Sequence, residues 1–447
     1  MSMTWQETFT AAVHEITNGH RENAAQLLQK ARLLNPRNPD LHYKCGLGFK
    51  EIGRHDAAIF SFQDSLQLRG GQAEVYFELG IAFYREGRIG EAIESMVRAI
   101  ECRPEYPNAH TNLTVFLSLA EEDHGLAPRV YRRLHENQTI KNLGPRRIRI
   151  EVSSVCNLRC QHCPTGTNYR GAMRQLMPMA TFDRVLAQLK ELPVASDGIF
   201  YLGGEPLLHK ELPLMCRRIK EETGIHYTHF TTNAMLLNEE ICRGLATAKL
   251  DRILVSVDGR SPAENDRVRQ GADYAAIVRN VHLLKEYLPD TEIIISNVIV
   301  KQVGDPEVPQ VGEFLARDFA GFGIQTIYAM KWPGFELNRS ALPGVGVLAG
   351  EPRGFCQMPF TEMAVRANGD VVICCYDLLS RQVMGNVGQQ SLLEIWRSPE
   401  YEALRQGILQ GSGSGLTPLC RSCERFTGEL LIMPETVPEK VSEHVAA

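Results

Sequence analysis

The chain has 447 residues, which at about 150 residues per domain predicts roughly three domains. Hydrophobic residues make up 44% and charged residues 23%, and the 37 glycines and 23 prolines follow no triplet period, so a collagen-like or disordered chain is excluded. The formal net charge of −5 provides no excess of cations to neutralise phosphates, so nucleic acid is not an expected partner. No signal peptide and no apolar run of about 18 residues is found, so we expect a cytoplasmic protein with no membrane partner.

The first third of the chain repeats itself with a period of 34 residues. Small residues recur at this spacing in several columns, for example Gly19, Gly53 and Gly87. A period of this length, with small residues where two antiparallel helices pack closely, resembles the tetratricopeptide repeat. The resemblance implies three helix pairs over about residues 3–104, and we expect a fourth pair, 108–120 and 126–137, to cap the array.

Residues 1–140 are therefore expected to form a tetratricopeptide repeat domain, an all-α helical repeat solenoid. Solenoids of this class bind polypeptides on a concave surface. We expect a peptide, a carrier protein or a partner subunit to bind there, and the alternative is an appendage that only stabilises the chain. Residues 141–147, which contain Gly-Pro and three cations, are expected to be the linker to the next domain.

The chain contains 12 cysteines, most of them clustered. Clustered cysteines in a chain without a signal peptide are more typical of metal binding or redox chemistry than of disulfides. Cys156, Cys160 and Cys163 follow a strand-like segment, 148–152, with the spacing C-x3-C-x2-C. Three thiolates leave one iron of a four-iron cluster without a protein ligand, so that iron can bind another molecule.

The three-cysteine loop resembles that of the radical S-adenosylmethionine superfamily, which also places it after the first strand. The resemblance implies a [4Fe-4S] cluster whose open iron binds S-adenosylmethionine. In that family one electron from the cluster, which an external donor supplies, then cleaves the sulfonium bond to give methionine and a 5′-deoxyadenosyl radical. His162 lies where the family usually has an aromatic ring near the adenine. The alternative is a zinc site with His162 as the fourth ligand.

Further motifs of the same superfamily follow in chain order. A strand-like segment, 197–202, precedes GGEP, whose backbone and glutamate meet the methionine ammonium group in the family. The segment 226–232 ends in TNA where the family has TNG, and 253–257 leads into SxDG, whose serine and neighbours reach the ribose or the carboxylate. An arginine that resembles the one binding the cofactor's carboxylate follows, and 292–300 carries an asparagine near the adenosine. The cofactor-binding residues that this resemblance implies are His162, Gly203, Gly204, Glu205, Asn233, Ser256, Asp258, Arg269 and Asn297.

Each of these motifs is weak alone. GGEP can be a simple turn, Asp258 can be a helix cap, and Asn233 can start a helix at Leu237. Together they alternate strand, loop and helix, which predicts an α/β partial (β/α)6 barrel over residues 141–340, the radical S-adenosylmethionine core. In such barrels the chemistry lies at the carboxyl ends of the strands, where these motifs fall.

The last third contains a second group of cysteines. Asn368-Gly369 predicts a hairpin between 362–366 and 370–374, a helix is expected near 392–406, and Cys420-x2-Cys423 follows. This order resembles the Twitch form of the SPASM extension over about residues 354–426. We therefore expect residues 341–447 to form a small α+β SPASM/Twitch-like domain with one auxiliary [4Fe-4S] cluster.

The resemblance also implies the ligands of the auxiliary cluster. These are Cys356, Cys374, Cys420 and Cys423, with Cys375 as the alternative to Cys374. Four thiolates saturate a cluster, so it would transfer electrons and not bind substrate directly. A zinc ribbon is the alternative. The remaining four cysteines, Cys45, Cys102, Cys216 and Cys242, are expected to be core residues.

Two clusters predict an oxidative or redox-neutral radical reaction. The leading hypothesis is an enzyme that abstracts hydrogen from a peptide or carrier-bound substrate, with the auxiliary cluster accepting or relaying an electron. One alternative is a dehydrogenase or epimerase of a small sugar or cyclitol metabolite, with the repeats used for oligomerisation. A weaker alternative is a non-catalytic zinc-binding adaptor. Fold-level analogy does not choose the product. An alcohol oxidation would also need a catalytic base, and the sequence assigns none.

Overall fold

The computed structural model describes residues 3–120, 125–166, 174–192, 195–333, 345–348, 354–411 and 415–433. The chain divides into two units, Met1–Leu143 and Gly144–Ala447. The boundary between them falls inside the segment 141–147 that we expected to be a linker. Helix α9 (Thr139–Leu143) covers the first part of that segment and strand β1 begins at Arg147, so the connection is shorter than expected.

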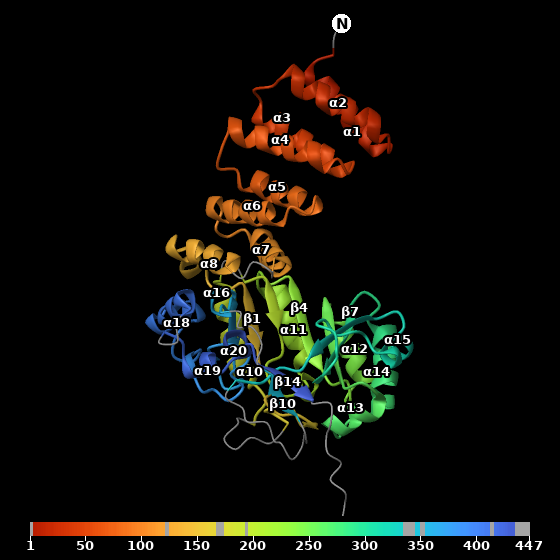
Figure 1. The fold of residues 1–447 in the computed structure, drawn as a ribbon, viewed down its shortest axis with the longest axis vertical. Helices are drawn as coiled ribbons and strands as arrows, with labels where there is room; N and C mark the ends of the chain where they lie inside the picture. The colour runs from red at the N-terminus through yellow and green to blue at the C-terminus, as the bar shows by residue number, and fades with distance from the viewer. Residues whose placement is uncertain are drawn as a thin grey trace, which may run out of the picture. The chain divides into compact units, whose positions relative to one another are not determined.

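The first unit is helical throughout its described part (Figure 1). The first residues of α1, α3, α5 and α7 lie 34 residues apart, and so do those of α2, α4 and α6. The turns within the first three pairs contain Gly19, Gly53 and Gly87 with φ of +78°, +78° and +72°, a conformation that glycine adopts without a steric penalty. The helices are α1 (Trp5–Thr17), α2 (Arg21–Leu34), α3 (Pro39–Glu51), α4 (His55–Leu68), α5 (Ala73–Arg85), α6 (Ile89–Cys102), α7 (Pro107–Leu119), α8 (Leu126–Glu136) and α9.

Close packing explains the columns of small residues. A Cβ atom on Gly46 would lie 2.4 Å from the ring of Phe62, and one on Gly80 would lie 2.4 Å from the terminal methyl of Met96. Larger side chains would therefore separate the paired helices. The prediction that the isolated cysteines are core residues is wrong for Cys102, which is exposed at the end of α6.

The second unit is built on a nine-stranded sheet with the order β13-β12-β11-β1-β3-β4-β5-β7-β9. Figure 1 labels three of these strands, β1, β4 and β7. Six of its strands run parallel and are adjacent in chain order, which confirms the expected α/β architecture with a mostly parallel sheet. These six strands are β1 (Arg147–Ile150), β3 (Asp197–Ile199), β4 (Tyr227–Thr232), β5 (Arg252–Asp258), β7 (Glu292–Ile299) and β9 (Gly323–Tyr328).

Helices connect the parallel strands, as parallel pairing requires. Cys216 and Cys242 are fully buried in α11 and α12, which confirms them as core residues. Helix α12 is capped by Asn238, whose side chain accepts from Ile241 N, so the alternative that Asn233 starts this helix is wrong. The helices are α10 (Met179–Leu189), the short η1 (Pro206–Leu208), α11 (Leu212–Glu222), α12 (Glu239–Ala246), α13 (Pro262–Val268), α14 (Tyr274–Tyr287) and α15 (Glu313–Asp318).

The C-terminal segment extends the same sheet. Strand β11 (Glu362–Val365) pairs in parallel with β1, and β12 (Asp370–Val372) pairs antiparallel with β11, which confirms the predicted hairpin. The turn contains Gly369 with φ of +89°. Strand β13 (Val383–Asn386) completes this edge. The expected helix near 392–406 is two helices, α17 (Leu392–Trp396) and α18 (Pro399–Gln410), because Pro399 lacks the N–H needed to continue the first.

The remaining elements are short. Strands β10 (Gly346–Leu348), β14 (Leu430–Met433) and β8 (Lys301–Gln302) form a three-stranded sheet, and β2 (Arg159–Cys160) pairs with β6 (Arg269–Gln270). The last helices are α16 (Met358–Thr361), α19 (Pro418–Arg421) and α20 (Glu424–Thr427). Within the described ranges, no helix has the length and apolar character needed to cross a bilayer.

Candidate functional site

The first thiol loop is held against the segment that follows β5. Cys160 in β2 pairs with Arg269 in β6, and Gln161 N donates to Val268 O over 2.9 Å. Cys156, Cys160 and Cys163 lie close enough to interact electrostatically. Burial raises the pKa of Cys160 to about 12, so this thiol is protonated until a metal displaces the proton.

The GGEP loop packs directly on the residues that precede the thiol loop. Gly204 has φ of +67°, and a Cβ atom there would lie 2.4 Å from Ser153 O and 2.6 Å from Val155 O. Glu205 N donates to Val155 O over 2.7 Å. Only glycine fits at this position, because both the backbone conformation and the contact exclude a side chain.

Glu205 and Asn233 connect three parts of the site. The Glu205 carboxylate accepts hydrogen bonds from Thr232 Oγ1 (2.7 Å), Asn233 N (2.8 Å) and Leu207 N (3.1 Å). The Asn233 side chain donates from Nδ2 to Asn157 Oδ1 over 2.9 Å, beside Cys156. The ends of β3 and β4 are thereby joined to the thiol loop.

Asp258 lies between two basic side chains. Arg269 Nη1 donates to Asp258 Oδ2 over 2.6 Å, and His162 Nε2 lies 3.3 Å from the same oxygen. Although burial opposes ionisation, the charge of Arg269 and then that of His162 hold the pKa of Asp258 well below its usual range. Asp258 Oδ1 and Arg269 Nε are buried and have no protein partner. A carboxylate oxygen and a guanidinium N–H are therefore left for a ligand.

Ser256 and Asn297 are not brought together. Ser256 pairs with Ser296 across the sheet, whereas Asn297 pairs with Val257, so the two side chains lie on opposite faces. The Asn297 side chain donates from Nδ2 to Val257 O and Gly259 O, each over 3.0 Å. In this arrangement Asn297 supports the turn after β5.

Tyr201 is a residue of this site that sequence reasoning missed. It lies two residues before Gly203, and its phenol interacts electrostatically with Cys163, Cys156, Arg269 and Glu205. Burial, followed by the charge of Cys163, raises the pKa of Tyr201. The sequence feature that could have identified it is a tyrosine in the strand-like segment 197–202, two residues before the GGEP loop.

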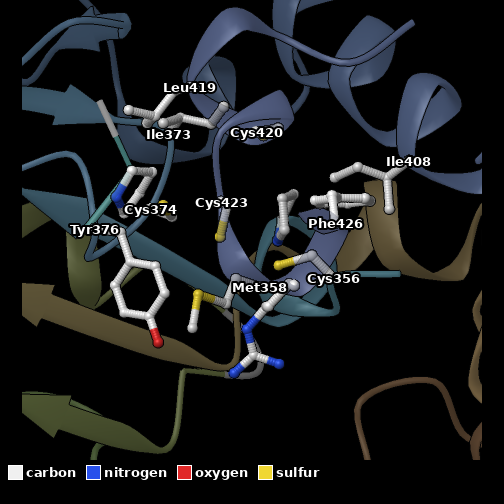
Figure 2. A pocket seen from close by; sticks show the side chains of 13 residues that line it. Cys356, Met358, Ile373, Cys374, Tyr376, Ile408, Leu419, Cys420, Cys423 and Phe426 are labelled. Carbon is white, nitrogen blue, oxygen red and sulfur yellow. The ribbon is translucent and has the colours of Figure 1, made fainter. Parts of the chain in front are cut away.

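A second thiol site lies in the C-terminal segment. A pocket of about 370 Å³, its open mouth included, is lined by Cys356, Cys374, Cys420 and Cys423 among mostly apolar residues (Figure 2). Burial raises the pKa of Cys356 to about 12 and that of Cys423 to about 11. This wall of thiols and apolar groups fits a four-thiolate cluster.

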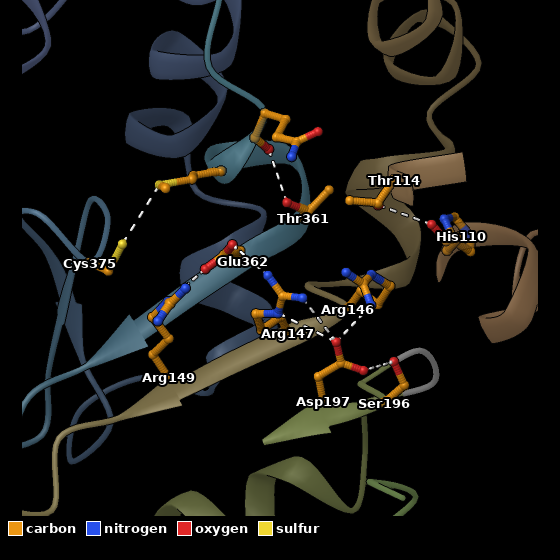
Figure 3. Close-up of polar contacts among 12 residues, drawn as sticks. His110, Thr114, Arg146, Arg147, Arg149, Ser196, Asp197, Thr361, Glu362 and Cys375 are labelled. Atoms are coloured by element: carbon orange, nitrogen blue, oxygen red, sulfur yellow. Dashed lines mark hydrogen bonds and ion pairs between the residues drawn. The ribbon is translucent and has the colours of Figure 1, made fainter. Parts of the chain in front are cut away.

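Cys375 lies outside this wall. Its sulfur is 3.8 Å from Met358 Sδ, and its neighbours in electrostatic range include Arg149 and Glu362. Arg149 Nε donates to Glu362 over 2.7 Å, and Arg147 Nη1 donates to the same carboxylate over 3.0 Å (Figure 3). The geometry therefore favours Cys374 over Cys375 as a ligand.

Both sites fit iron-sulfur clusters better than zinc. Tetrahedral zinc gathers its ligands within about 2.3 Å of one centre. In the part of the chain that the structure describes, no three His, Cys, Asp or Glu side chains converge in this way. A four-iron cluster spreads its ligands over a wider span, and the unpartnered polar atoms beside the first loop fit a cofactor such as S-adenosylmethionine.

Family models match the two segments that contain the clustered thiols. Residues 150–315 match the radical SAM superfamily, and residues 356–424 match SPASM, an iron-sulfur cluster-binding domain. The chain is therefore a radical SAM superfamily enzyme with a SPASM auxiliary-cluster domain. These domains imply a [4Fe-4S] cluster, S-adenosylmethionine and auxiliary iron-sulfur binding as its cofactors.

The chain is similar to characterised enzymes of different activity. It is 23% identical to the S-adenosyl-L-methionine-dependent 2-deoxy-scyllo-inosamine dehydrogenase of Niallia circulans over 63% of this chain and 93% of that protein. It is 31% identical to the GTP 3′,8-cyclase of Aquifex aeolicus over 40% of this chain, and it spans 53% of the cyclase. It also resembles the crystal structure of Streptococcus suis SuiB bound to S-adenosylmethionine, with 19% identity, 74% and 83% coverage of the two chains and a TM-score of 0.43.

Proposed function

We propose that this enzyme abstracts hydrogen from a peptide or a carrier-bound substrate, and that its auxiliary cluster accepts or relays an electron. The observation that carries the radical chemistry is the pairing of Cys160 with Arg269, which places the thiol loop beside the Asp258–Arg269 ion pair. When bound, the first cluster supplies the electron that splits S-adenosylmethionine, and the 5′-deoxyadenosyl radical then takes hydrogen from the substrate.

The chain's own residues bind and orient the cofactor in this proposal. Cys156, Cys160 and Cys163 would hold the cluster. The free Nε of Arg269 would bind the carboxylate of S-adenosylmethionine, and the free Oδ1 of Asp258 would accept a hydrogen bond from a ribose hydroxyl. The Gly203–Gly204 backbone and Glu205 would hold the ammonium group, and His162, Asn233, Ser256 and Asn297 complete the predicted set.

The auxiliary cluster belongs to the Twitch type in this proposal, with a single cluster held by four cysteines. The pocket wall supports Cys356, Cys374, Cys420 and Cys423 as its ligands. We assign residues 1–140 to a tetratricopeptide repeat domain, 141–340 to a partial (β/α)6 barrel and 341–447 to the auxiliary domain. Residues 341–344, 349–353, 412–414 and 434–447 of this last assignment lie outside the described residues.

The repeats would deliver the substrate. An apolar stripe runs over helices α1, α3, α5 and α7. Its residues occupy the fifth and ninth positions of these helices, which lie on one helix face because they are four residues apart. Val13 and Val115 in this stripe are each 44% exposed. The stripe consists of Phe9, Tyr43 and Phe77 at the fifth helical positions and Val13, Leu47, Ile81 and Val115 at the ninth. A partly exposed apolar stripe of this kind supports a polypeptide partner.

A small cyclitol or sugar is the second candidate substrate. Its support is the likeness to the 2-deoxy-scyllo-inosamine dehydrogenase, which extends over 93% of that protein. In that case the repeats would serve oligomerisation. The zinc-binding adaptor is the weakest candidate, because the described thiols lack the spacing of a single-ion site.

An anaerobic assay separates these candidates. The full-length chain is reconstituted with iron and sulfide, reduced, and supplied with S-adenosylmethionine and either a peptide panel or 2-deoxy-scyllo-inosamine. We expect 5′-deoxyadenosine formation to rise with a peptide and not with the aminocyclitol. An L47E/I81E variant should lose this stimulation and keep the basal rate, whereas F60E, which alters a 64% exposed side chain on α4, should keep both. Stimulation by the aminocyclitol alone would support the second candidate, and absence of iron would support the adaptor.

A further inference from the structure

A half-buried arginine lies in the wall of the auxiliary pocket. Arg425 lines the pocket with the four cysteines and is the residue directly after the SPASM match, which ends at 424. Its guanidinium lies within electrostatic range of Cys356 and of the Tyr376 hydroxyl. Tyr376 also lines the pocket (Figure 2). Cys375 and Cys423 are within electrostatic range of the same side chain.

Within the described residues, no direct ion pair neutralises the charge of Arg425. Among the residues that the structure describes, no carboxylate lies within 4.0 Å of its guanidinium nitrogens, and its Nε is buried without a hydrogen-bond partner. Glu424 acts on Arg425 electrostatically but from a greater distance. The charge is therefore available to the contents of the pocket.

We propose that Arg425 sets the reduction potential of the auxiliary cluster by stabilising its reduced state, an inference that rests on the proposed function. Reduction adds one negative charge to a cluster that four thiolates already make negative. A half-buried cation in the pocket wall favours the more negative state, since charges there are screened less than at the exposed surface. The one electron that the substrate radical loses after hydrogen abstraction would reduce the oxidised cluster by one equivalent, so the step would balance without another oxidant.

A redox titration of the full-length, reconstituted chain tests this role, with electron paramagnetic resonance reporting each cluster separately. R425Q should lower the equilibrium constant for reduction of the auxiliary cluster at least tenfold, which is about 59 mV for a one-electron couple. R425K keeps the charge and should shift the potential by less than half as much. The first cluster should keep its potential in both variants.

R421Q is the matched control. Arg421 lies between Cys420 and Cys423 in the sequence but is exposed, so solvent screens its charge and no shift is expected. An unchanged or raised potential in R425Q, or equal shifts in R425Q and R421Q, would overturn the proposal.

Loss of the cluster is also informative. If R425Q loses the auxiliary cluster while R425K keeps it with nearly the wild-type potential, the result supports a role of the charge. Loss in both variants would overturn it and assign Arg425 a packing role. A wild-type chain with only one cluster would overturn both this inference and the auxiliary part of the proposed function. Two clusters in the wild-type chain, with no shift of the auxiliary potential in R425Q, would overturn the role of Arg425 alone.

Discussion

Glu151 and Arg366 form a buried ion pair, with Arg366 Nε donating to Glu151 Oε2 over 2.7 Å. Glu151 directly follows β1 and Arg366 directly follows β11, so the pair joins the radical SAM match to the SPASM match. Arg366 Nη1 also donates to Asp377 O, and Asp377 N donates to Cys374 O, each over 3.1 Å. A continuous set of hydrogen bonds therefore connects the end of β1 with a proposed cluster ligand.

Breaking this pair should destabilise the second unit. R366M leaves the Glu151 carboxylate buried without its cation, which costs about 3–5 kcal/mol. Urea unfolding of the apoprotein should show this loss, and E151M/R366M should lose less than the sum of the single changes. The exposed pair Arg252–Glu292 is the control, since R252Q should cost no more than about 1 kcal/mol. Equal losses in R366M and R252Q would contradict the importance of burial.

Glu362 should make stability depend on pH in the acid range. Burial opposes its ionisation, but Arg149 and Arg147 lower the pKa of Glu362 from 4.5 to about 2. A carboxyl with a lowered pKa in the folded state contributes stability above pH 4.5, and this stability is lost as the pH falls from 4.5 to 2. The contribution is about 3 kcal/mol.

An E362Q variant isolates this effect in urea unfolding of the apoprotein. We expect E362Q to be less stable than wild type at pH 7 and the two free energies of unfolding to converge near pH 2. E292Q, at the exposed pair with Arg252, should follow wild type closely. Parallel curves for wild type and E362Q from pH 7 to pH 2 would contradict the lowered pKa.

The cysteines should divide between two clusters. The reconstituted chain should contain about eight irons, and changing Cys156, Cys160 and Cys163 together to alanine should leave about four. C374A should also lose about four irons, whereas C375A should lose none, because Cys375 lies outside the pocket wall. Iron and sulfide analysis checks these numbers. The opposite result for Cys374 and Cys375 would reassign the ligand.

Asp258 should control cofactor affinity without controlling cluster content. D258N removes the negative charge between Arg269 and His162, so Arg269 loses the partner that orients it. We expect binding of S-adenosylmethionine to weaken at least tenfold, which is about 1.4 kcal/mol, while the iron content is unchanged. Anaerobic calorimetry measures the affinity. R267Q, which alters an exposed arginine paired with Glu264, should bind as wild type does, and an unaltered affinity in D258N would exclude this role.

Local patterns predicted much of the fold. The 34-residue period placed the helix pairs because each turn and each close contact depends on residues near in sequence. The alternation of apolar residues likewise placed the parallel strands. The break between α17 and α18 is predictable from Ser398-Pro399, a helix-capping serine followed by a proline at the first helical position. Exposure of Cys102 was not predictable from its apolar neighbours, because it depends on which face of α6 is covered.

By itself, the sequence determined the two groups of thiols, the order of the cofactor motifs and the helical repeat, since these are properties of spacing along the chain. Only the tertiary structure decided that β11 joins β1, that Glu151 meets Arg366 across 215 residues, that Cys374 faces the pocket and that Arg425 lies in its wall. Parallel pairing brings distant segments together, and a shift of one residue reverses the face that a side chain occupies. The spacing of residues along the chain therefore predicts the kind of chemistry, and the pairing of the strands determines which side chains come into contact.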